Sequence, residues 1–179
     1  PNNVTKVKNL TDSVVHHIDI ISSIARSFSD FAQMPTIKNE NINVIEQVRR
    51  SIDIFPPSIV EYTFNTDYIA FRMDPLYLTR IITNIIKNGI QASSGNSELK
   101  ILVEVSDLGE DFLIKIQDNG HGIPLKYQDK VFQPNFTTKS TGMGLGLPMV
   151  KKIVEDYNGS IWFETQENIG TTFFIKFKK

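Results

Sequence analysis

Two glycine clusters occupy residues 118–122 (DNGHG) and 142–146 (GMGLG), and a polar stretch between them carries Phe136-Thr137-Thr138-Lys139. Glycines at this density allow a backbone to approach a ligand closely and to adopt positive φ, at an entropic cost that a simple connecting loop has no reason to bear. The whole segment is therefore interpreted as the wall of a nucleotide pocket.

The second cluster leads directly into an amphipathic helical pattern that begins at Leu145. Gly142, Gly144 and Gly146 are therefore expected at the start of a helix. The exposed N–H groups and the positive end of the helix dipole at such a position favour a phosphate group.

The first cluster follows a strand pattern in which Phe112, Ile114 and Ile116 alternate with polar residues. Asp118 is thus expected at the end of this strand, beside a turn. A carboxylate in this position can accept a hydrogen bond from an exocyclic amine such as that of adenine, and it discriminates against bases that lack one. The alternative is that DNGHG is only a tight hairpin turn, in which Asn-Gly and Asp-Gly are common.

A stripe of amide side chains lies on the segment 75–93, whose apolar spacing predicts an amphipathic helix. Asn84, Asn88 and Gln91 are separated by four and three residues, so they share one helix face. Asparagine is a poor helix former, and amides on an otherwise apolar helix require a partner. One interpretation is a solvated face. The other is that Oδ1 of Asn88 helps to coordinate a Mg²⁺ whose other ligands are water and triphosphate oxygens.

Four motifs follow one another along the chain: NIIKNGIQA (84–92), DNGHGI (118–123), FQPNFTTK (132–139) and GMGLGL (142–147). Together they resemble the asparagine box, first glycine box, phenylalanine box and second glycine box of the ATP-binding domain of sensor histidine kinases, a branch of the GHKL or Bergerat-fold superfamily. Within that branch, the segments SFSDFAQMP and FQPNFTTK are similar to those of nitrogen-regulation-type kinases.

The resemblance, together with the predicted elements, implies an α+β fold: a two-layer α/β sandwich of the Bergerat type, with a mixed sheet that carries its helices on one face, preceded by a long N-terminal helix. Residues 40–179 would form the ATP-binding catalytic domain. Residues 1–35 would form the second helix of a dimerisation hairpin, because a broad apolar heptad pattern extends from Val4 to Ala32 and Pro35 then ends the helix.

The remaining elements of the catalytic domain are predicted from hydrophobic spacing. Apolar residues at helical spacing predict a helix over 41–55, and alternating residues predict strands. The strands are expected at 59–65, 69–72, 99–105, 112–117, 161–163 and 171–177.

Three residues depart from the family pattern. Gly89 stands where alanine is usual, at a cost in helix stability of roughly 1 kcal/mol. Asn135 replaces the aromatic or small residue of the phenylalanine box. Gln91 stands where many relatives carry a lysine or arginine that faces the phosphates, which implies a modest affinity for the γ-phosphate.

By resemblance, the chain would transfer the γ-phosphate of Mg-ATP to a histidine. Asp118 would bind the adenine amine, Asn88 the magnesium ion, and Lys139, on a mobile lid, the phosphates. The implied nucleotide site comprises Asn84, Asn88, Gln91, Asp118, Gly120, Gly122, Ile123, Thr137, Thr138, Lys139, Gly142, Gly144, Leu145, Gly146 and Leu147. The family's acceptor histidine opens an H-E-[I/L]-x-N-P motif, whereas His16 and His17 occur in HHIDIISS, so no catalytic acceptor is expected in this sequence.

The position four residues before Asn88 distinguishes two reaction classes. ATP-hydrolysing members of the superfamily carry a water-activating glutamate there, whereas this chain carries Asn84, and an amide cannot act as a general base at neutral pH. Transfer to an external acceptor is therefore favoured over fast hydrolysis. Two alternatives stay open: a regulatory module that binds ATP or ADP without phosphotransfer, and a GHKL-type ATPase or serine kinase.

The composition excludes several other classes. A formal net charge of −1 gives no support to nucleic-acid binding, and the absence of cysteine excludes disulfides and thiolate metal sites. The sequence has neither an apolar run of membrane-spanning length nor a signal peptide, and it begins without methionine, so we expect a cytoplasmic fragment of a longer protein that can itself be membrane-anchored. The expected partners are the acceptor-histidine helix of the full-length kinase, a response regulator receiver domain and, in the parent protein, a second copy in a homodimer.

Overall fold

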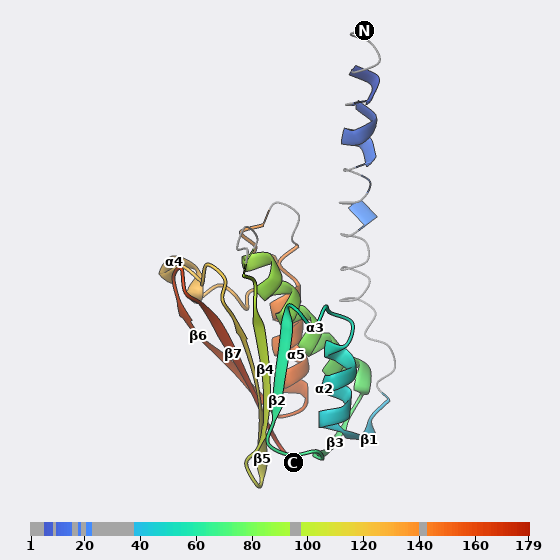
Figure 1. Cartoon of the computed structure of the whole chain (residues 1–179), viewed down its shortest axis with the longest axis vertical. Coiled ribbons are helices and arrows are strands. Elements are labelled where there is room, and N and C mark those ends of the chain that lie inside the picture. Colours follow the sequence, from blue (N-terminus) through green and yellow to red (C-terminus); the bar gives the residue numbers. More distant parts are fainter. Residues whose placement is uncertain are drawn as a thin grey trace.

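The computed structural model describes residues 6–8, 10–15, 18, 21–22, 38–93, 98–139 and 143–179. The described residues of the N-terminal segment are helical, and nearly all of them are exposed (Figure 1). His16, His17 and Pro35 lie outside the described residues. The assignment of residues 1–35 to a dimerisation hairpin therefore stays a prediction.

The architecture is built on a mixed sheet of five strands. These are β2 (Val60–Phe64), β4 (Ile101–Asp107), β5 (Asp111–Asp118), β6 (Ser160–Gln166) and β7 (Gly170–Lys178). The strand order is β2-β4-β5-β7-β6, in which β2 and β4 are parallel and the other neighbours are antiparallel. A separate antiparallel pair is formed by β1 (Glu40–Asn43) and β3 (Ala70–Met73).

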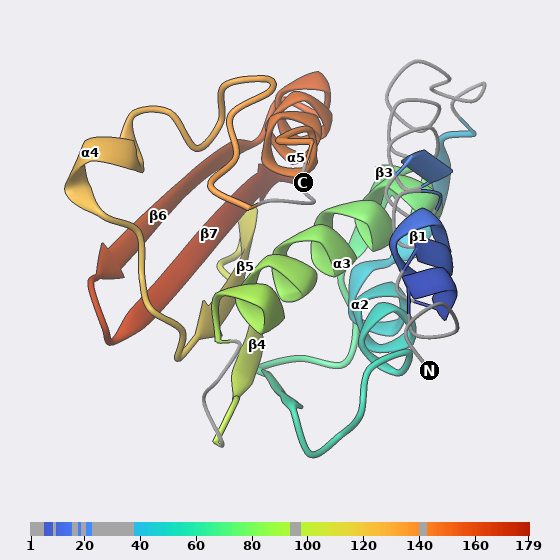
Figure 2. The ribbon, with the colours of Figure 1, turned by 90° about the horizontal axis from the view of Figure 1, so that it is seen from above.

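Three helices lie on one face of the five-stranded sheet, as Figure 2 shows: α2 (Val44–Ile52), α3 (Pro75–Ala92) and α5 (Gly146–Asp156). A short helix, α4 (Leu125–Gln128), lies close to β6 and β7. The predicted α+β fold, with helices on one face of a mixed sheet, is confirmed. None of the helices in the described ranges combines the length and the apolar character that a bilayer span requires.

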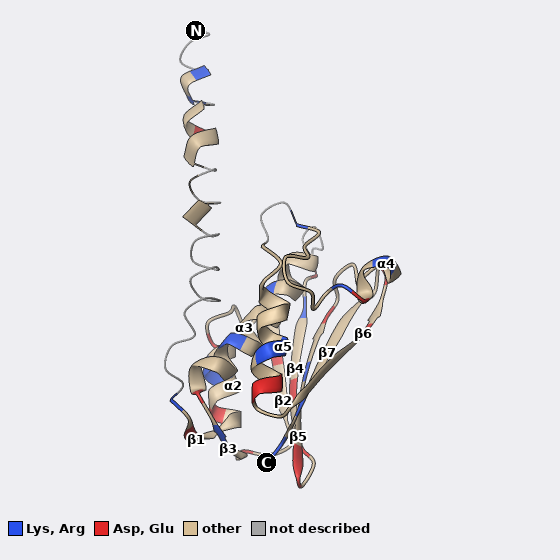
Figure 3. Ribbon diagram, turned by 180° about the vertical axis from the view of Figure 1, so that it is seen from behind, with Lys and Arg blue, Asp and Glu red and all other residues tan. Residues whose placement is uncertain are grey.

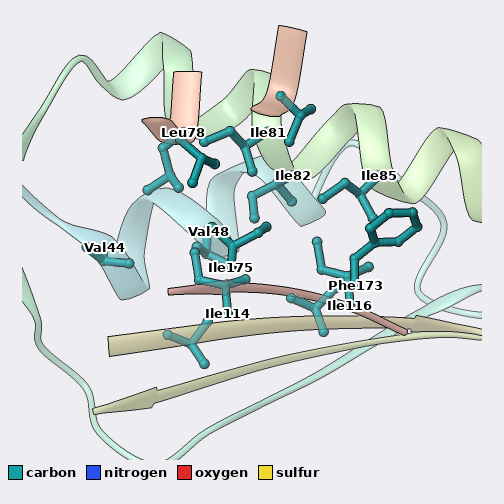
Figure 4. Close-up of a cluster of buried hydrophobic side chains, with 14 of the residues drawn as sticks. Val44, Val48, Leu78, Ile81, Ile82, Ile85, Ile114, Ile116, Phe173 and Ile175 are labelled. Atoms are coloured by element: carbon teal, nitrogen blue, oxygen red, sulfur yellow. The ribbon is translucent and has the colours of Figure 1, made fainter. Parts of the chain in front are cut away.

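The core lies between the helices and the inner face of the sheet. On β5 the residues Phe112, Ile114 and Ile116 are buried and alternate with more exposed neighbours, as expected for a strand with one covered face. They meet the apolar face of α3, represented in Figure 4 by Ile82 and Ile85. Burial of each such side chain stabilises the fold by roughly 1.5–3 kcal/mol.

The sequence prediction of a helix over 41–55 was wrong at both ends of α2. Residues 41–43 belong to strand β1, and the helix begins only at Val44 and ends at Ile52. Asn43 sets the N-terminal boundary, because its Oδ1 accepts hydrogen bonds from the N–H groups of Ile45 (3.1 Å) and Ile69 (3.2 Å). Asparagine is among the preferred residues for capping a helix N-terminus, and this preference prevailed over the apolar spacing.

Helix α3 agrees with its prediction to within one residue. Asp74 caps it by accepting a hydrogen bond from the N–H of Leu76 at 2.9 Å, and Pro75 occupies its first turn. One face of α3, from Tyr77 to Gly89, packs in the core, and another face of its second half carries the amide stripe. The helix thereby fixes Asn88 and Gln91 on a rigid support.

Candidate functional site

A cavity of about 820 Å³ lies between the last turns of α3, the end of β5, the region of α4 and the start of α5. Its walls include most of the site residues predicted from the sequence. These are Asn84, Asn88, Gln91, Asp118, Gly122, Ile123, Thr137, Thr138, Lys139, Gly144, Leu145, Gly146 and Leu147. Gly120 is absent from the cavity wall, and Gly142 lies outside the described residues. Four motifs spread over residues 84–147 therefore meet around one space.

Asp118 continues the buried row of β5 and is only 8% exposed. Its Oδ1 accepts hydrogen bonds from the N–H groups of Gly120 (2.9 Å) and Thr171 (3.2 Å). Burial raises the pKa of this carboxyl group, although the two hydrogen bonds oppose the shift. Both hydrogen bonds that the carboxylate accepts within the described part of the chain go to Oδ1, so Oδ2 is the oxygen left for a donor in the cavity.

Gly120 and Gly122 have different tasks. Gly120 lies behind the cavity wall, where a Cβ would be 2.9 Å from the Cβ of Ala92, so its role is to bring the turn against α3. Gly122 lines the cavity with φ of +70°, and a Cβ there would lie 2.3 Å from the carbonyl oxygen of Gln166. The first glycine cluster is thus a close-packed turn that shapes the pocket beside Asp118.

The amide stripe of α3 faces Lys139. The Nζ of Lys139 donates hydrogen bonds to Oδ1 of Asn88 at 3.0 Å and to Oε1 of Gln91 at 2.5 Å. Burial lowers the pKa of the Lys139 ammonium group, and the carboxylate of Asp118 opposes the shift. Two neutral amide oxygens therefore already hold a cation at this point of the cavity.

Asn84 lies one helical turn before Asn88 and is held in place by its own helix. Its Nδ2 donates a hydrogen bond to the carbonyl oxygen of Arg80 at 2.8 Å. Its Oδ1 lies 3.0 Å from the position that a Cβ on Gly146 would occupy. The glycine at position 146 therefore lets the start of α5 approach α3 closely.

The N-terminus of α5 opens into the cavity without a capping side chain. Leu145 is its N-cap residue and makes no side-chain capping hydrogen bond. Gly146 and Leu147 supply first-turn N–H groups that have no acceptor among the described residues, whereas Pro148 has none to supply. Uncapped donors and the positive end of the helix dipole together suit an anionic group.

Residues 137–143, of which 140–142 lie outside the described residues, are here called the lid. The segments that flank the lid are joined by a hydrogen bond from the N–H of Asn135 to the carbonyl oxygen of Gly144 at 3.2 Å. Both residues have a φ of +64°, and a Cβ on Gly144 would lie 2.3 Å from the carbonyl oxygen of Phe136. Asparagine tolerates positive φ better than most residues, which explains why it replaces the usual residue of the phenylalanine box.

Sequence reasoning missed several residues of the cavity wall. Arg80 and Lys87 lie on the face of α3 that also carries the amides, so their helical spacing gave a usable signal. Figure 3 shows that basic and acidic residues are spread over several helices and strands. Thr171 is the register partner of Asp118 and becomes recognisable only once β5 and β7 are paired. Tyr127 comes from the unpredicted helix α4.

The charges of the cavity wall are unequal. Arg80, Lys87 and Lys139 are its basic residues, whereas Asp118 is the single carboxylate among the described residues that line it. The part of the chain that the structure describes holds no cluster of three or more histidine, cysteine or acidic residues that would bind a metal by itself. A metal ion here would need oxygen ligands from a bound anion and from water.

Comparison with known families gives one match of broad extent. The family model described as "Histidine kinase-, DNA gyrase B-, and HSP90-like ATPase" matches residues 73–179. The matched region begins just before α3 and includes all four motifs that surround the cavity.

Comparison with individual proteins gives relatives among sensor kinases. The nitrogen regulation protein NtrY of Azorhizobium caulinodans is 30% identical over 159 residues, which is 84% of this chain and 21% of that protein. This chain therefore spans about a fifth of that relative's length.

Solved structures of histidine kinases share the fold. The nucleotide-free catalytic domain of histidine kinase ThkA has a TM-score of 0.69 and 28% identity, over 79% of this chain and 96% of that chain. The complex of ThkA with the response regulator protein TrrA has a TM-score of 0.74 at 22% identity, over 93% of this chain and 49% of that chain, a likeness of fold alone.

Proposed function

Because this chain belongs to the histidine kinase-, DNA gyrase B- and HSP90-like ATPase family, we propose that it is the ATP-binding catalytic domain of a sensor histidine kinase. It binds Mg-ATP so that the γ-phosphate is transferred to a histidine outside this sequence. The observation that carries the proposal is the convergence of Asp118, the uncapped start of α5 and the amide stripe of α3 around one cavity.

Asp118 selects the base. Its Oδ2 accepts the hydrogen bond of the adenine amine, while Oδ1 stays bound to the N–H groups of Gly120 and Thr171. Ile123, half-buried beside it, offers an apolar surface to the ring. Guanine carries an oxygen in place of the amine and would leave the carboxylate facing an acceptor, so adenine nucleotides are preferred.

The phosphates occupy the basic side of the cavity. The first turn of α5 supplies N–H donors at Gly146 and Leu147, and Lys139 supplies a positive charge from the lid. Asn88 fits a Mg²⁺ ion, because its Oδ1 is a hard, neutral oxygen ligand that already faces the ammonium group of Lys139. When bound, the ion neutralises charge on the phosphate oxygens. The chain itself positions and orients the nucleotide, which is most of what phosphoryl transfer requires.

Transfer is favoured over hydrolysis by the residues near the phosphates. Asn84 is an amide and cannot take a proton from water at neutral pH. Its Nδ2 is engaged with the carbonyl oxygen of Arg80. Asp118, the one carboxylate among the described lining residues, is assigned to binding of the adenine ring. His121 also lines the cavity, but it lies beside Asp118 at the adenine end, so the described residues supply no general base near the phosphates for an attacking water.

The acceptor and partners follow from the same proposal. His121 is the one histidine among the described residues, and it lies beside Asp118 at the base end of the cavity. It is therefore poorly placed to receive the γ-phosphate. We assign the acceptor to a helix that precedes residues 1–35 in the parent homodimer, and a response regulator receiver domain as the next phosphate acceptor, as the ThkA complex with TrrA suggests by fold likeness.

Calorimetry and a labelling assay test the proposal together. The folded chain should bind ADP and ATP in the presence of magnesium, and Asp118→Asn should weaken both by roughly 10–100-fold, the value of a hydrogen bond to a charged group. Radiolabelled ATP supplied with the parent's acceptor helix should then leave an acid-labile label on histidine. An acid-stable label on serine would indicate a serine kinase, and binding without label would indicate a regulatory module. No heat with either nucleotide would refute the proposal.

A further inference from the structure

The ammonium group of Lys139 is hydrogen-bonded to Oδ1 of Asn88, the oxygen that the proposed metal ion requires as a ligand. The ammonium lies 3.0 Å from Oδ1 of Asn88 and also bonds Oε1 of Gln91. Both acceptors are neutral, and no ion pair of Lys139 with a carboxylate occurs within the described ranges. Lys139 is thus held on α3 by two neutral oxygens, and the carboxylate of Asp118 acts on it through space rather than by a direct ion pair among the described residues.

The same oxygen cannot hold both cations. Mg²⁺ binds oxygen at about 2.0–2.1 Å and demands near-octahedral surroundings, so an ion on Asn88 Oδ1 would lie within a few ångströms of an ammonium that shares the oxygen. Like charges at that separation in a half-buried cavity repel strongly. Lysine has a long flexible stem, whereas Asn88 is fixed on helix α3, so Lys139 is the group that can withdraw.

Resting on the proposed function, we propose that Lys139 and Mg²⁺ alternate on Asn88, and that the lysine serves as a built-in counter-cation for metal-free nucleotide. Without metal, the ammonium stays at the amide pair and meets the phosphate oxygens directly. With metal, it leaves Asn88, and the ion takes over most of the charge neutralisation at the phosphates. The site therefore accepts free ADP and ATP as well as their magnesium complexes.

The proposal makes the effect of Lys139 depend on magnesium. A lysine that only touched phosphate would contribute equally with and without metal. A lysine that replaces the metal contributes most when the metal is absent. The deciding quantity is the ratio of the ADP dissociation constant in EDTA to that in saturating magnesium, compared between variants.

The test measures this ratio by calorimetry for the wild type, Lys139→Met, Lys139→Arg and Lys87→Met. Methionine keeps the length of the side chain and removes the charge, whereas arginine keeps the charge. Lys87 is the matched control, because it lines the cavity from α3 but has no hydrogen bond to Asn88 among the described contacts. Thermal melts confirm that each variant is folded.

In Lys139→Met the ratio should rise by about tenfold or more, the size of a charge-assisted hydrogen bond to phosphate. In Lys139→Arg and Lys87→Met it should stay close to the wild-type value. An unchanged ratio in Lys139→Met would overturn the inference, and so would a wild type that binds ADP only with magnesium. Absence of binding in both conditions would instead refute the proposed function itself.

Discussion

A Cβ atom added to Gly89 would lie 2.9 Å from the Cβ of Asp118, a distance that real Cβ atoms do not reach. Helix α3 therefore passes the end of β5 so closely that only glycine fits. This explains a residue that costs helix stability, because Gly89 lets the helix pack closely against the buried carboxylate of Asp118. The same added atom would lie 2.7 Å from Cδ1 of Ile101.

Gly89→Ala should weaken ADP binding by about fivefold or more, since Asp118 must move to admit the methyl group. The better helix propensity of alanine, worth about 1 kcal/mol, is opposed by overpacking of about 1–3 kcal/mol. We expect a net loss of stability in urea denaturation. Adding Ile101→Val removes the Cδ1 atom and should restore part of the stability while ADP affinity stays low. Recovery of affinity in the double variant would contradict the role assigned to Asp118.

Asp118→Asn should stabilise the nucleotide-free protein. An asparagine Oδ1 can keep the hydrogen bonds from Gly120 and Thr171, and the variant no longer buries a charge. We expect the free energy of unfolding at neutral pH to rise by roughly 1 kcal/mol, as is common when a functional site is relaxed. Ala substitution at the same position is the control, since it loses both hydrogen bonds and should destabilise the protein.

This stability difference should depend on pH in a defined direction. The pKa of Asp118 is raised in the folded state, so the folded protein binds the proton more tightly than the unfolded chain does. The wild type therefore loses stability as the pH rises from about 4, the ordinary value for aspartate, through the raised pKa. The advantage of Asp118→Asn should be small near pH 4 and largest at neutral pH. An advantage that is constant or falls with rising pH would contradict the burial argument.

Asn135→Ala should loosen the lid. Alanine at a φ of +64° costs about 1–2 kcal/mol, whereas glycine does not. Urea denaturation and the rate of tryptic cleavage after Lys139 measure the effect, and Asn135→Gly should behave like the wild type. Asn158→Ala is the matched control, because Asn158 also has a positive φ (56°) but follows the far end of α5. It should lower stability without changing cleavage at Lys139.

The parts of the fold that could be predicted are those in which several local signals agree. Helix α3 has a capping aspartate, a proline in its first turn and an uninterrupted apolar face, and its prediction was correct to one residue. Strand β5 alternates strictly and ends at Asp118. The positions of the site residues could also be predicted, because these residues belong to four short motifs attached to the ends of such elements.

The parts of the fold and of the site that could not be predicted depend on contacts between distant segments. Strand β1 forms only because it pairs with β3, so residues 41–43 read as helix in isolation. Helix α4 has four residues and is too short for a periodic signal. Thr171 reaches Asp118 through strand register, and Gly120 turns away from the cavity to pack against Ala92. The binding role of each site residue stays a prediction.

Two tyrosines near the start of α3 form a matched pair for a last prediction. The rings of Tyr77 and Tyr157 lie 6.3 Å apart, yet their hydroxyl groups differ. The hydroxyl of Tyr157 accepts a hydrogen bond from the N–H of Asp74 at 3.1 Å and donates one to Oδ1 of Asn39 at 2.5 Å. The hydroxyl of Tyr77 is buried and has no hydrogen-bond partner in the described part of the chain.

Tyr157→Phe and Tyr77→Phe should therefore shift stability in opposite directions. Loss of the two Tyr157 hydrogen bonds should lower the free energy of unfolding by about 1–2 kcal/mol, and amide exchange at Asp74 should accelerate. Removal of the unsatisfied Tyr77 hydroxyl should raise the free energy of unfolding by about 1 kcal/mol, because a buried hydrogen-bond donor without a partner is costly. For a domain of this size, each kcal/mol corresponds to about 2–4 °C in Tm. Equal losses in both variants would mean that Tyr77 has a hydrogen-bond partner in solution.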